Sequence, residues 1–180
     1  MPDASTTEES IVSRTLQEVI KEAKRIEERS RLTSKSHFKA AAVWANLHLL
    51  VGIPAVVLAA IASALAHSQV SDTKIDVAII SVAVAALTAL QTFLNPSERE
   101  QKHLVAGNNY ASLENRTRIF WTIQCWQEPN SDSALTARVL HLSEEDDKLK
   151  SSSPPIPGWA YFLAKRAVAK GETTYDVDKV

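Results

Sequence analysis

The chain has 180 residues, 45% of them hydrophobic, and its 20 lysines and arginines against 21 acidic residues give a formal net charge of −1. This balance offers no basic excess for counterion release, so we expect no nucleic-acid partner. The single cysteine, Cys125, excludes an intramolecular disulfide, and no spacing of Cys and His is typical of a zinc site. Nothing in the length requires more than one compact unit.

The mean hydropathy of −0.11 averages two very different kinds of sequence. Residues 40–71 contain no Asp, Glu, Lys or Arg, and neither do residues 77–97. Every charge therefore lies in the rest of the chain, which is unusually polar for the core of a globular protein. The local pattern, rather than the average composition, indicates the class of protein.

The first predicted element is a helix within an N-terminal cytoplasmic segment, residues 1–42. Ser5 and Thr6 are each followed three residues later by a glutamate, which is typical of a capping box at a helix start. Apolar residues then recur at spacings of four and three, as in a coiled-coil seam: Val12, Leu16, Val19, Ala23 and Ile26. We expect this seam to pack on a partner helix, from this chain or from a neighbour.

Two apolar segments follow, at about residues 43–65 and 75–94. A bilayer core about 30 Å thick takes on the order of 20 apolar residues of helix, so each segment is long enough to cross it. The intervening AHSQVSDTK is short and contains turn-forming residues. The sequence therefore predicts an all-α membrane protein, with a two-transmembrane helical hairpin at residues 43–94 and cytoplasmic N- and C-terminal helices.

Two other interpretations fit the apolar segments less well. Two buried helices of a soluble protein would need apolar sequence around them, and the rest of the chain supplies too little. A cleaved signal peptide is suggested by Ala62-Ser63-Ala64, which resembles a cleavage site. However, about 39 mostly polar residues precede the apolar run and a second apolar segment follows it.

The distribution of Lys and Arg predicts the orientation of the hairpin. Six basic residues lie shortly before the first span, only Lys74 lies in the connecting loop, and Arg99 and Lys102 follow the second span. Both termini should therefore be cytoplasmic, with Phe38, Trp44 and Phe93 near the inner membrane interface, where aromatic rings are favoured.

Small residues repeat every four positions on both spans, a spacing that lets helix backbones approach closely in lipid. The two rows are Ala55, Ala59 and Ser63 on the first span, and Ser81, Ala85 and Ala89 on the second.

A polar stripe also follows one face of the second span, and two polar residues lie near the inner end of the first. The stripe is Ser81, Thr88, Gln91 and Asn95, and the residues of the first span are Asn46 and His48. Polar groups in hydrocarbon are costly unless they meet water or one another. The stripe therefore either lines a water-filled path in an oligomer or hydrogen bonds within the hairpin.

The second span ends at a predicted joint, after which residues 95–170 form a cytoplasmic helical region. Asn95 suits a helix cap, Pro96 the first position of a new helix, and Glu98 the third position of a capping box. We expect this helix to run to about Gln127. Its buried face is predicted to be Ala106, Tyr110, Leu113, Thr117 and Phe120.

Two more helices are predicted, separated by the stiff linker SSSPPIP. The first covers about residues 132–150, with Leu135, Val139, Leu142 and Leu149 on its apolar side. The second is short, covers residues 158–170, and carries Trp159, Tyr161 and Phe162. Residues 171–180 are predicted to be a disordered tail.

The run FLNPSEREQKHLVAGNNYASLENRTRIF, residues 93–120, follows directly after the predicted hairpin. In that position it resembles the signature of the SLATT family, two-transmembrane effectors associated with nucleotide-generating SMODS and nucleotide-sensing SLOG partners. PPIPGWAY, residues 154–161, also resembles the segment that closes family members, and the resemblance covers roughly residues 10–170. The matching positions of the first run are Phe93, Pro96, Arg99, His103, Ala106, Gly107, Tyr110, Leu113 and Arg118.

The resemblance implies a pore-forming effector of a conflict, defence or cell-death system, which permeabilises the cell's own membrane on a cytoplasmic signal. No fused sensor is evident, so we expect any nucleotide-signalling or sensor partner to be a separate protein. The resulting hypothesis is a homo-oligomeric gated pore in the cell membrane. The predicted pore-lining residues are Ser81, Thr88, Gln91, Asn46 and His48, and the joint at Asn95 and Pro96 would gate the pore.

Two functions from other classes stay open: a non-conducting scaffold that tethers partner proteins through its cytoplasmic helices, and a hairpin insertase that is soluble until triggered. The glycines form no phosphate cradle, and Cys125 has no evident base. We therefore expect neither an enzyme nor a cofactor or metal. The motif residues Arg99, His103, Tyr110 and Arg118 either bind a ligand or pack the cytoplasmic layer, and packing is the favoured interpretation.

Overall fold

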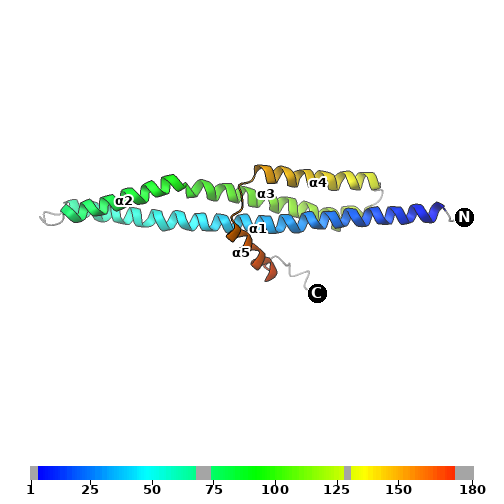
Figure 1. The fold of residues 1–180 in the computed structure, drawn as a ribbon, viewed down its shortest axis with the longest axis horizontal. Coiled ribbons are helices and arrows are strands. Elements are labelled where there is room, and N and C mark those ends of the chain that lie inside the picture. Colours follow the sequence, from blue (N-terminus) through cyan, green and yellow to red (C-terminus); the bar gives the residue numbers. More distant parts are fainter. Residues whose placement is uncertain (1–3, 68–73, 128–130, 173–180) are drawn as a thin grey trace. The chain divides into compact units, whose positions relative to one another are not determined.

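The computed structural model describes residues 4–67, 74–127 and 131–172, with side chains from Arg14 in the first range and from Asp76 in the second. Every element in these ranges is helical and none is a strand, which confirms the all-α prediction for them (Figure 1). The elements are α1 (Ala4–His67), α2 (Lys74–Leu94), α3 (Pro96–Thr122), the short 3-10 helix η2 (Gln124–Trp126), α4 (Asp132–Ser152) and α5 (Gly158–Ala169).

Several sequence predictions fall outside the described residues. These are the capping side chains near the N-terminus, the contact made by Val12, the turn at residues 68–73, and the predicted tail from residue 173 onward.

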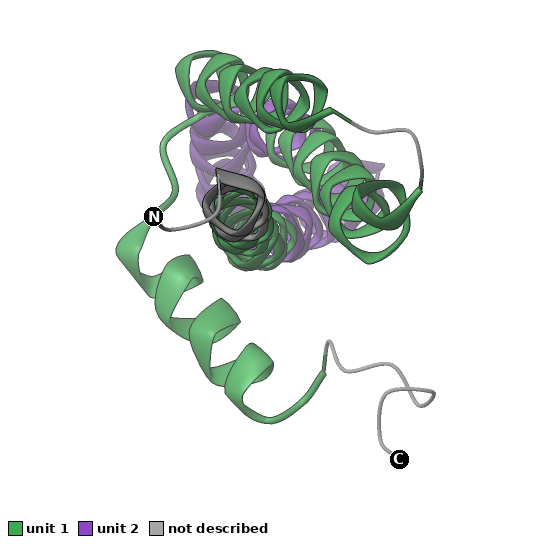
Figure 2. Cartoon of the chain, turned by 90° about the vertical axis from the view of Figure 1, so that its right-hand side faces the viewer, with its two compact units in different colours: residues 1–39, 103–180 green, residues 40–102 purple. Residues whose placement is uncertain are grey.

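The chain divides into two compact units, which Figure 2 shows in different colours. The first combines residues 1–39 with residues 103–180, and the second is residues 40–102. The first unit thus contains the polar part of α1, most of α3, and α4 and α5. The second contains the apolar part of α1, the whole of α2 and the first residues of α3.

The core of the first unit is formed where α1, α3 and α4 meet. Val19, Ala23 and Ile26 of α1 are buried in one cluster with Leu113 and Phe120 of α3. Leu135, Val139 and Leu142 of α4 complete that cluster, with Leu149 packed against it. The predicted seam of α1 therefore finds its partner helices within this chain.

The helices of the first unit begin and end close to the predicted positions, with one difference. The predicted buried face of α3 is confirmed at all five positions. Ser131 caps α4 by accepting a hydrogen bond from the backbone N–H of Ala134 at 3.3 Å. However, α3 ends at Thr122 instead of near Gln127. The backbone tightens into η2 because the N–H of Trp126 bonds to the carbonyl of Ile123, and this turn buries Cys125.

The second unit is an apolar hairpin of two helices. α1 continues without a break from the polar N-terminal segment through the first apolar segment, with Pro54 inside it. α2 covers the second apolar segment. Both stretches are long and apolar enough to cross a membrane by length and composition. Their most apolar windows are only 11% and 0% buried, so neither is shielded as the core helix of a soluble protein would be.

Candidate functional site

A groove of 610 Å³ runs along the hairpin between α1 and α2. Its walls are mainly aliphatic, and its polar lining comes from His48, Thr88 and Gln91. The Gln91 amide hydrogen bonds with Nδ1 of His48 at 3.1 Å, and a Cβ atom at Gly52 would lie only 3.2 Å from that amide. Three of the five predicted pore-lining residues therefore meet at one place, whereas Asn46 and Ser81 do not line the groove.

The hydroxyl groups of the polar stripe donate to their own helix. Ser81 Oγ donates to the carbonyl of Val77 at 2.8 Å, and Thr88 Oγ1 donates to that of Val84 at 2.9 Å. A hydroxyl bonded to the fourth preceding carbonyl has already satisfied its donor, so it can face an apolar environment at reduced cost. Both side chains are exposed in the single chain.

The rows of small residues differ in their surroundings. On α1, Ala55 is buried against the hairpin, whereas Ala59 and Ser63 are exposed. On α2 the complete row of Ser81, Ala85 and Ala89 is exposed. The small-residue row of α2 is therefore not used to bring α2 close to α1.

The predicted joint lies between α2 and α3. Asn95 has a φ of 42°, in the left-handed region that Asn tolerates better than most residues, and Pro96 begins α3 as expected. The expected capping box does not form. The Asn95 N–H still bonds to the carbonyl of Gln91, so it is not free for Glu98. Instead, the Asn95 side-chain amide donates to the carboxylate of Glu98.

Arg99, on the α3 side of this joint, contacts both α2 and α1 within the second unit. Its Nε donates to the carbonyl of Leu94 at 2.9 Å, which satisfies an acceptor at the end of α2. Its guanidinium lies 4.9 Å from the ring centroid of Trp44, a cation–π distance. Phe93, another motif residue, has a side chain that is 85% exposed.

Two histidines face each other in the first unit. Nδ1 of His37 on α1 lies 2.9 Å from Nδ1 of His103 on α3, and both rings are buried. Tyr110 stacks on His37 with ring centroids 5.7 Å apart. One ring must donate and the other accept, so the pair can carry at most one added proton without two donors facing each other. Burial and the neighbouring His103 lower the pKa of His37 to about 4.

One turn from this pair, Gly107 permits a close approach of α3 to α1. A Cβ atom there would lie 2.9 Å from Cε1 of Phe38, closer than carbon atoms pack. Ser34 Oγ donates to the Gly107 carbonyl at 2.9 Å and fixes the same contact. His103, Gly107 and Tyr110 thus form one buried layer with the α1 side chains, which we call the histidine layer: Ser34, His37, Phe38, His103, Gly107 and Tyr110.

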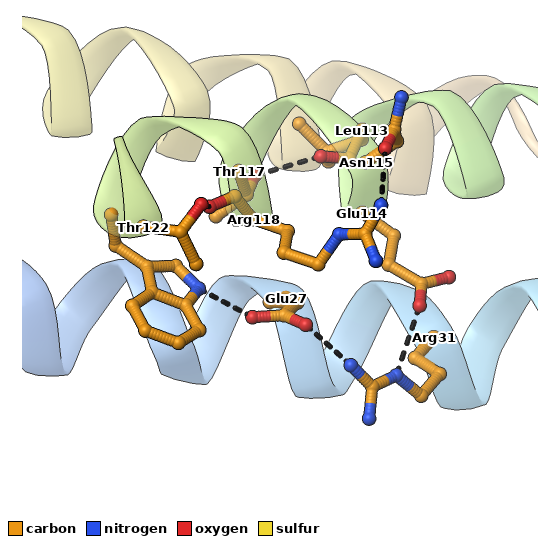
Figure 3. Close-up of polar contacts among 9 residues, drawn as sticks. Glu27, Arg31, Leu113, Glu114, Asn115, Thr117, Arg118 and Thr122 are labelled. Carbon is orange, nitrogen blue, oxygen red and sulfur yellow. Dashed lines mark hydrogen bonds and ion pairs between the residues drawn. The ribbon is translucent and has the colours of Figure 1, made fainter. Parts of the chain in front are cut away.

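A second polar cluster links α1 to α3 farther from the joint (Figure 3). Arg31 bonds to Glu27 within α1, and its Nε donates to Glu114 of α3 at 2.9 Å. The other carboxylate oxygen of Glu27 accepts from the indole N–H of Trp121 at 2.5 Å. Burial opposes the charge of Arg31, but its hydrogen bonds and its attraction to both carboxylates raise its pKa.

The motif residues that carry the family resemblance have different contacts within each unit. In the first unit, His103, Gly107 and Tyr110 belong to the histidine layer, whereas the guanidinium of Arg118 donates to Asn115 on the same helix at 3.0 Å (Figure 3). In the second unit, Asn95, Pro96 and Arg99 form the joint.

Sequence reasoning missed the partners on α1. Ser34 and His37 were not singled out, and Phe38 was expected only near the membrane interface, although a signal was present. The helical spacing of Val19, Ala23 and Ile26 continues, at intervals of four, four and three, through Ser30, Ser34 and His37, all buried. Because these residues are polar, they did not count toward an apolar seam, yet they occupy the same helix face.

No metal or nucleophilic site stands out in the described part of the chain. There, no group of three or more His, Cys, Asp and Glu residues is placed to hold a metal ion. Cys125 is buried, and burial raises the pKa of its thiol, which disfavours the reactive thiolate.

Comparison of the chain with protein-family models, with curated proteins and with solved structures found no match. The resemblance to the SLATT family therefore stays a prediction carried by the motif residues.

Proposed function

We propose that the chain is an integral membrane protein that crosses the bilayer twice and assembles into a homo-oligomeric, gated pore. The supporting observation is the exposure of two long apolar helical stretches, of which at most 11% is buried. Apolar area of this extent is unfavourable in water and favourable in lipid. The excess of basic residues beside the spans would keep both termini cytoplasmic.

Two features of the hairpin support assembly and conduction. The exposed row of Ser81, Ala85 and Ala89 offers a surface on which a second helix backbone can approach closely. The groove beside it carries Thr88, Gln91 and His48, the polar groups that a water-filled path needs. In this proposal the histidine layer and the charged cluster of Glu27, Arg31 and Glu114 hold the cytoplasmic helices together, and the joint at Asn95 transmits the signal. A pore effector of a defence or cell-death system is the corresponding biological role.

The first test measures membrane potential with a voltage-sensitive dye in bacterial cells induced to make the chain. Wild type is expected to depolarise the cells. The Thr88→Leu and Gln91→Leu double variant should not, because it removes two polar groups from the groove. Thr92→Leu is the matched control: Thr92 is exposed on the same helix with its hydroxyl bonded to the Thr88 carbonyl, and it does not line the groove.

The alternative is a non-conducting scaffold that tethers partner proteins through the first unit. Its supporting observation is that polar side chains within this unit connect α1 to α3 and α4. A scaffold would give unchanged potential in cells where fractionation places the wild-type chain in the membrane, and it would still retain partners. Depolarisation that persists in the double variant would contradict the assignment of the pore wall.

A further inference from the structure

The last helix, α5, is packed with its large apolar residues outward. Its buried residues are all alanines: Ala160, Ala164 and Ala167. The exposed residues include four large apolar side chains: Trp159, Tyr161, Phe162 and Leu163. Phe162 alone is 65% exposed. A helix that served only to stabilise the first unit would bury such side chains, because removing large apolar side chains from water is favourable.

The charges of α5 have one sign. Lys165 and Arg166 are exposed, Lys170 follows the last turn, and no acidic residue occurs between Gly158 and Ala169. Glu172, the next acidic residue along the chain, is paired with Lys39 of α1 at 3.7 Å. Exposed aromatic rings beside basic residues that form no ion pair within the described part of the chain fit a surface that is apolar below and anionic above, as the headgroup region of an anionic bilayer is.

Contacts within the first unit place α5 beside the part of α1 that precedes the apolar stretch. The linker before α5 starts at the histidine layer, since Ser153 hydrogen bonds with Tyr110. Glu172, three residues beyond the end of α5, pairs with Lys39, and Lys39 is the last charged residue before residues 40–71, which carry no charge. A span that begins after Lys39 would therefore start within one helical turn of a residue that the segment following α5 contacts.

We propose that α5 is an interfacial anchor whose Trp159, Tyr161 and Phe162 insert among the headgroups of an anionic bilayer, with Lys165 and Arg166 on lipid phosphates. The inference rests on the proposed membrane location of the hairpin. It extends that proposal by giving α5 a lipid partner, which would couple the first unit to the membrane surface. A second copy of the chain is the competing occupant, but two copies would bring the like charges of Lys165 and Arg166 together.

The test uses the full-length chain with Cys125→Ala and one introduced cysteine that carries an environment-sensitive fluorophore. The three positions are Phe162→Cys on α5, Leu140→Cys on α4 as the exposed control outside the proposed contact, and Val82→Cys on α2 as the control inside a span. All three are strongly exposed in the single chain. The labelled chains are reconstituted in phosphatidylcholine vesicles with one quarter phosphatidylglycerol, and a nitroxide-labelled lipid serves as quencher.

Quenching at positions 162 and 82 but not at position 140 is expected. At position 162 it should fall several-fold when phosphatidylglycerol is omitted, or when Lys165→Glu and Arg166→Glu are introduced, and it should stay unchanged at position 82. Quenching at 82 alone would overturn the anchor while leaving the membrane proposal intact. Self-quenching between labels at position 162 without lipid quenching would assign the surface to a second copy. Absence of quenching at position 82 would overturn the membrane location, and the anchor with it.

Discussion

At the scale of a single residue, Gly107 determines how closely α3 approaches α1. The Ser34 hydroxyl holds the Gly107 carbonyl at 2.9 Å, while the Phe38 ring fills the space that a Cβ atom would need. A methyl group at position 107 must therefore displace either the ring or the helix. The hydrogen bond opposes movement of the helix backbone, so the Phe38 ring would have to shift from its present contact.

Gly107→Ala is expected to destabilise the chain by about 1–3 kcal/mol, the usual cost of overpacking a contact. The measurement is denaturant unfolding in detergent, followed by helical circular dichroism. Gly158→Ala is the matched control, since a Cβ there meets nothing within 4 Å. Adding Phe38→Leu should recover part of the loss. Equal effects of the two glycine substitutions would show that the contact with Phe38 does not explain the loss of stability.

The buried histidine pair makes the stability of the first unit depend on pH. The folded chain resists protonation of His37, whose pKa falls from 6.5 to about 4, so the unfolded chain binds more protons between these values. The contribution of neutral His37 is thus fully present above pH 6.5 and is lost as the pH falls toward 4. From pH 7.5 to pH 5 the expected loss is about 2 kcal/mol.

Unfolding measured across this range should show the loss in wild type and a much smaller one in His37→Gln, which keeps a polar side chain but cannot take up the proton. The window ends at pH 5 so that most carboxylates remain charged. A wild-type profile that is flat between these values would mean that the ring stays protonatable in the fold, contrary to its burial between α1 and α3.

At the scale of elements, the periodicity of apolar residues predicted which apolar side chains are buried, but it did not predict the buried polar side chains. The seam at Val19, Ala23 and Ile26 and the buried face of α3 follow from spacing alone, and both are confirmed in the core of the first unit. The histidine layer lies on the same helix faces, but a polar residue is as consistent with an exposed position as with a buried one. Which polar residues are buried depends on how α1 pairs with α3. The periodicity of the sequence does not reveal this pairing.

The joint shows a second limit, because its residues were recognised while its hydrogen bonds were not. Pro96 was expected to begin a helix, and it does. The capping box was wrong, since the Asn95 N–H continues the ladder of α2 and the chain turns through a left-handed residue instead. A positive φ is a property of the backbone in three dimensions, and a sequence containing Asn merely permits it.

The left-handed conformation of Asn95 predicts an asymmetric response to substitution. Asn95→Gly should keep the joint and change stability little, whereas Asn95→Val should cost about 1–2 kcal/mol, because a β-branched residue is strained at positive φ. Thermal unfolding in detergent compares the two variants. If valine is tolerated as well as glycine, the joint does not depend on this conformation.

At the scale of the whole molecule, the two units differ in which side chains they bury. The first buries apolar and polar residues together, with partners for the seam of α1 on α3 and α4. The second leaves nearly all of its apolar surface uncovered. Composition predicted this contrast, since charge is absent from residues 40–71 and 77–97. The outward direction of the small-residue row on α2 could not be predicted, because helical spacing fixes which residues share a face but not what that face meets.

That outward row leads to the prediction that tests assembly. Ala85→Phe with Ala89→Phe should weaken self-association, because two large rings prevent a second backbone from approaching the row. Chemical crosslinking in isolated membranes, followed by mass determination in detergent, measures the size distribution. Ala86→Phe is the matched control, being an exposed alanine on the same helix that lies off the row. Because the row faces away from α1, the hairpin itself should stay intact, so a lower oligomer with unchanged helix content is expected. An oligomer that persists with both rings in place would move the contact between copies to another surface, and the pore would then have to be assembled around a different face of the hairpin.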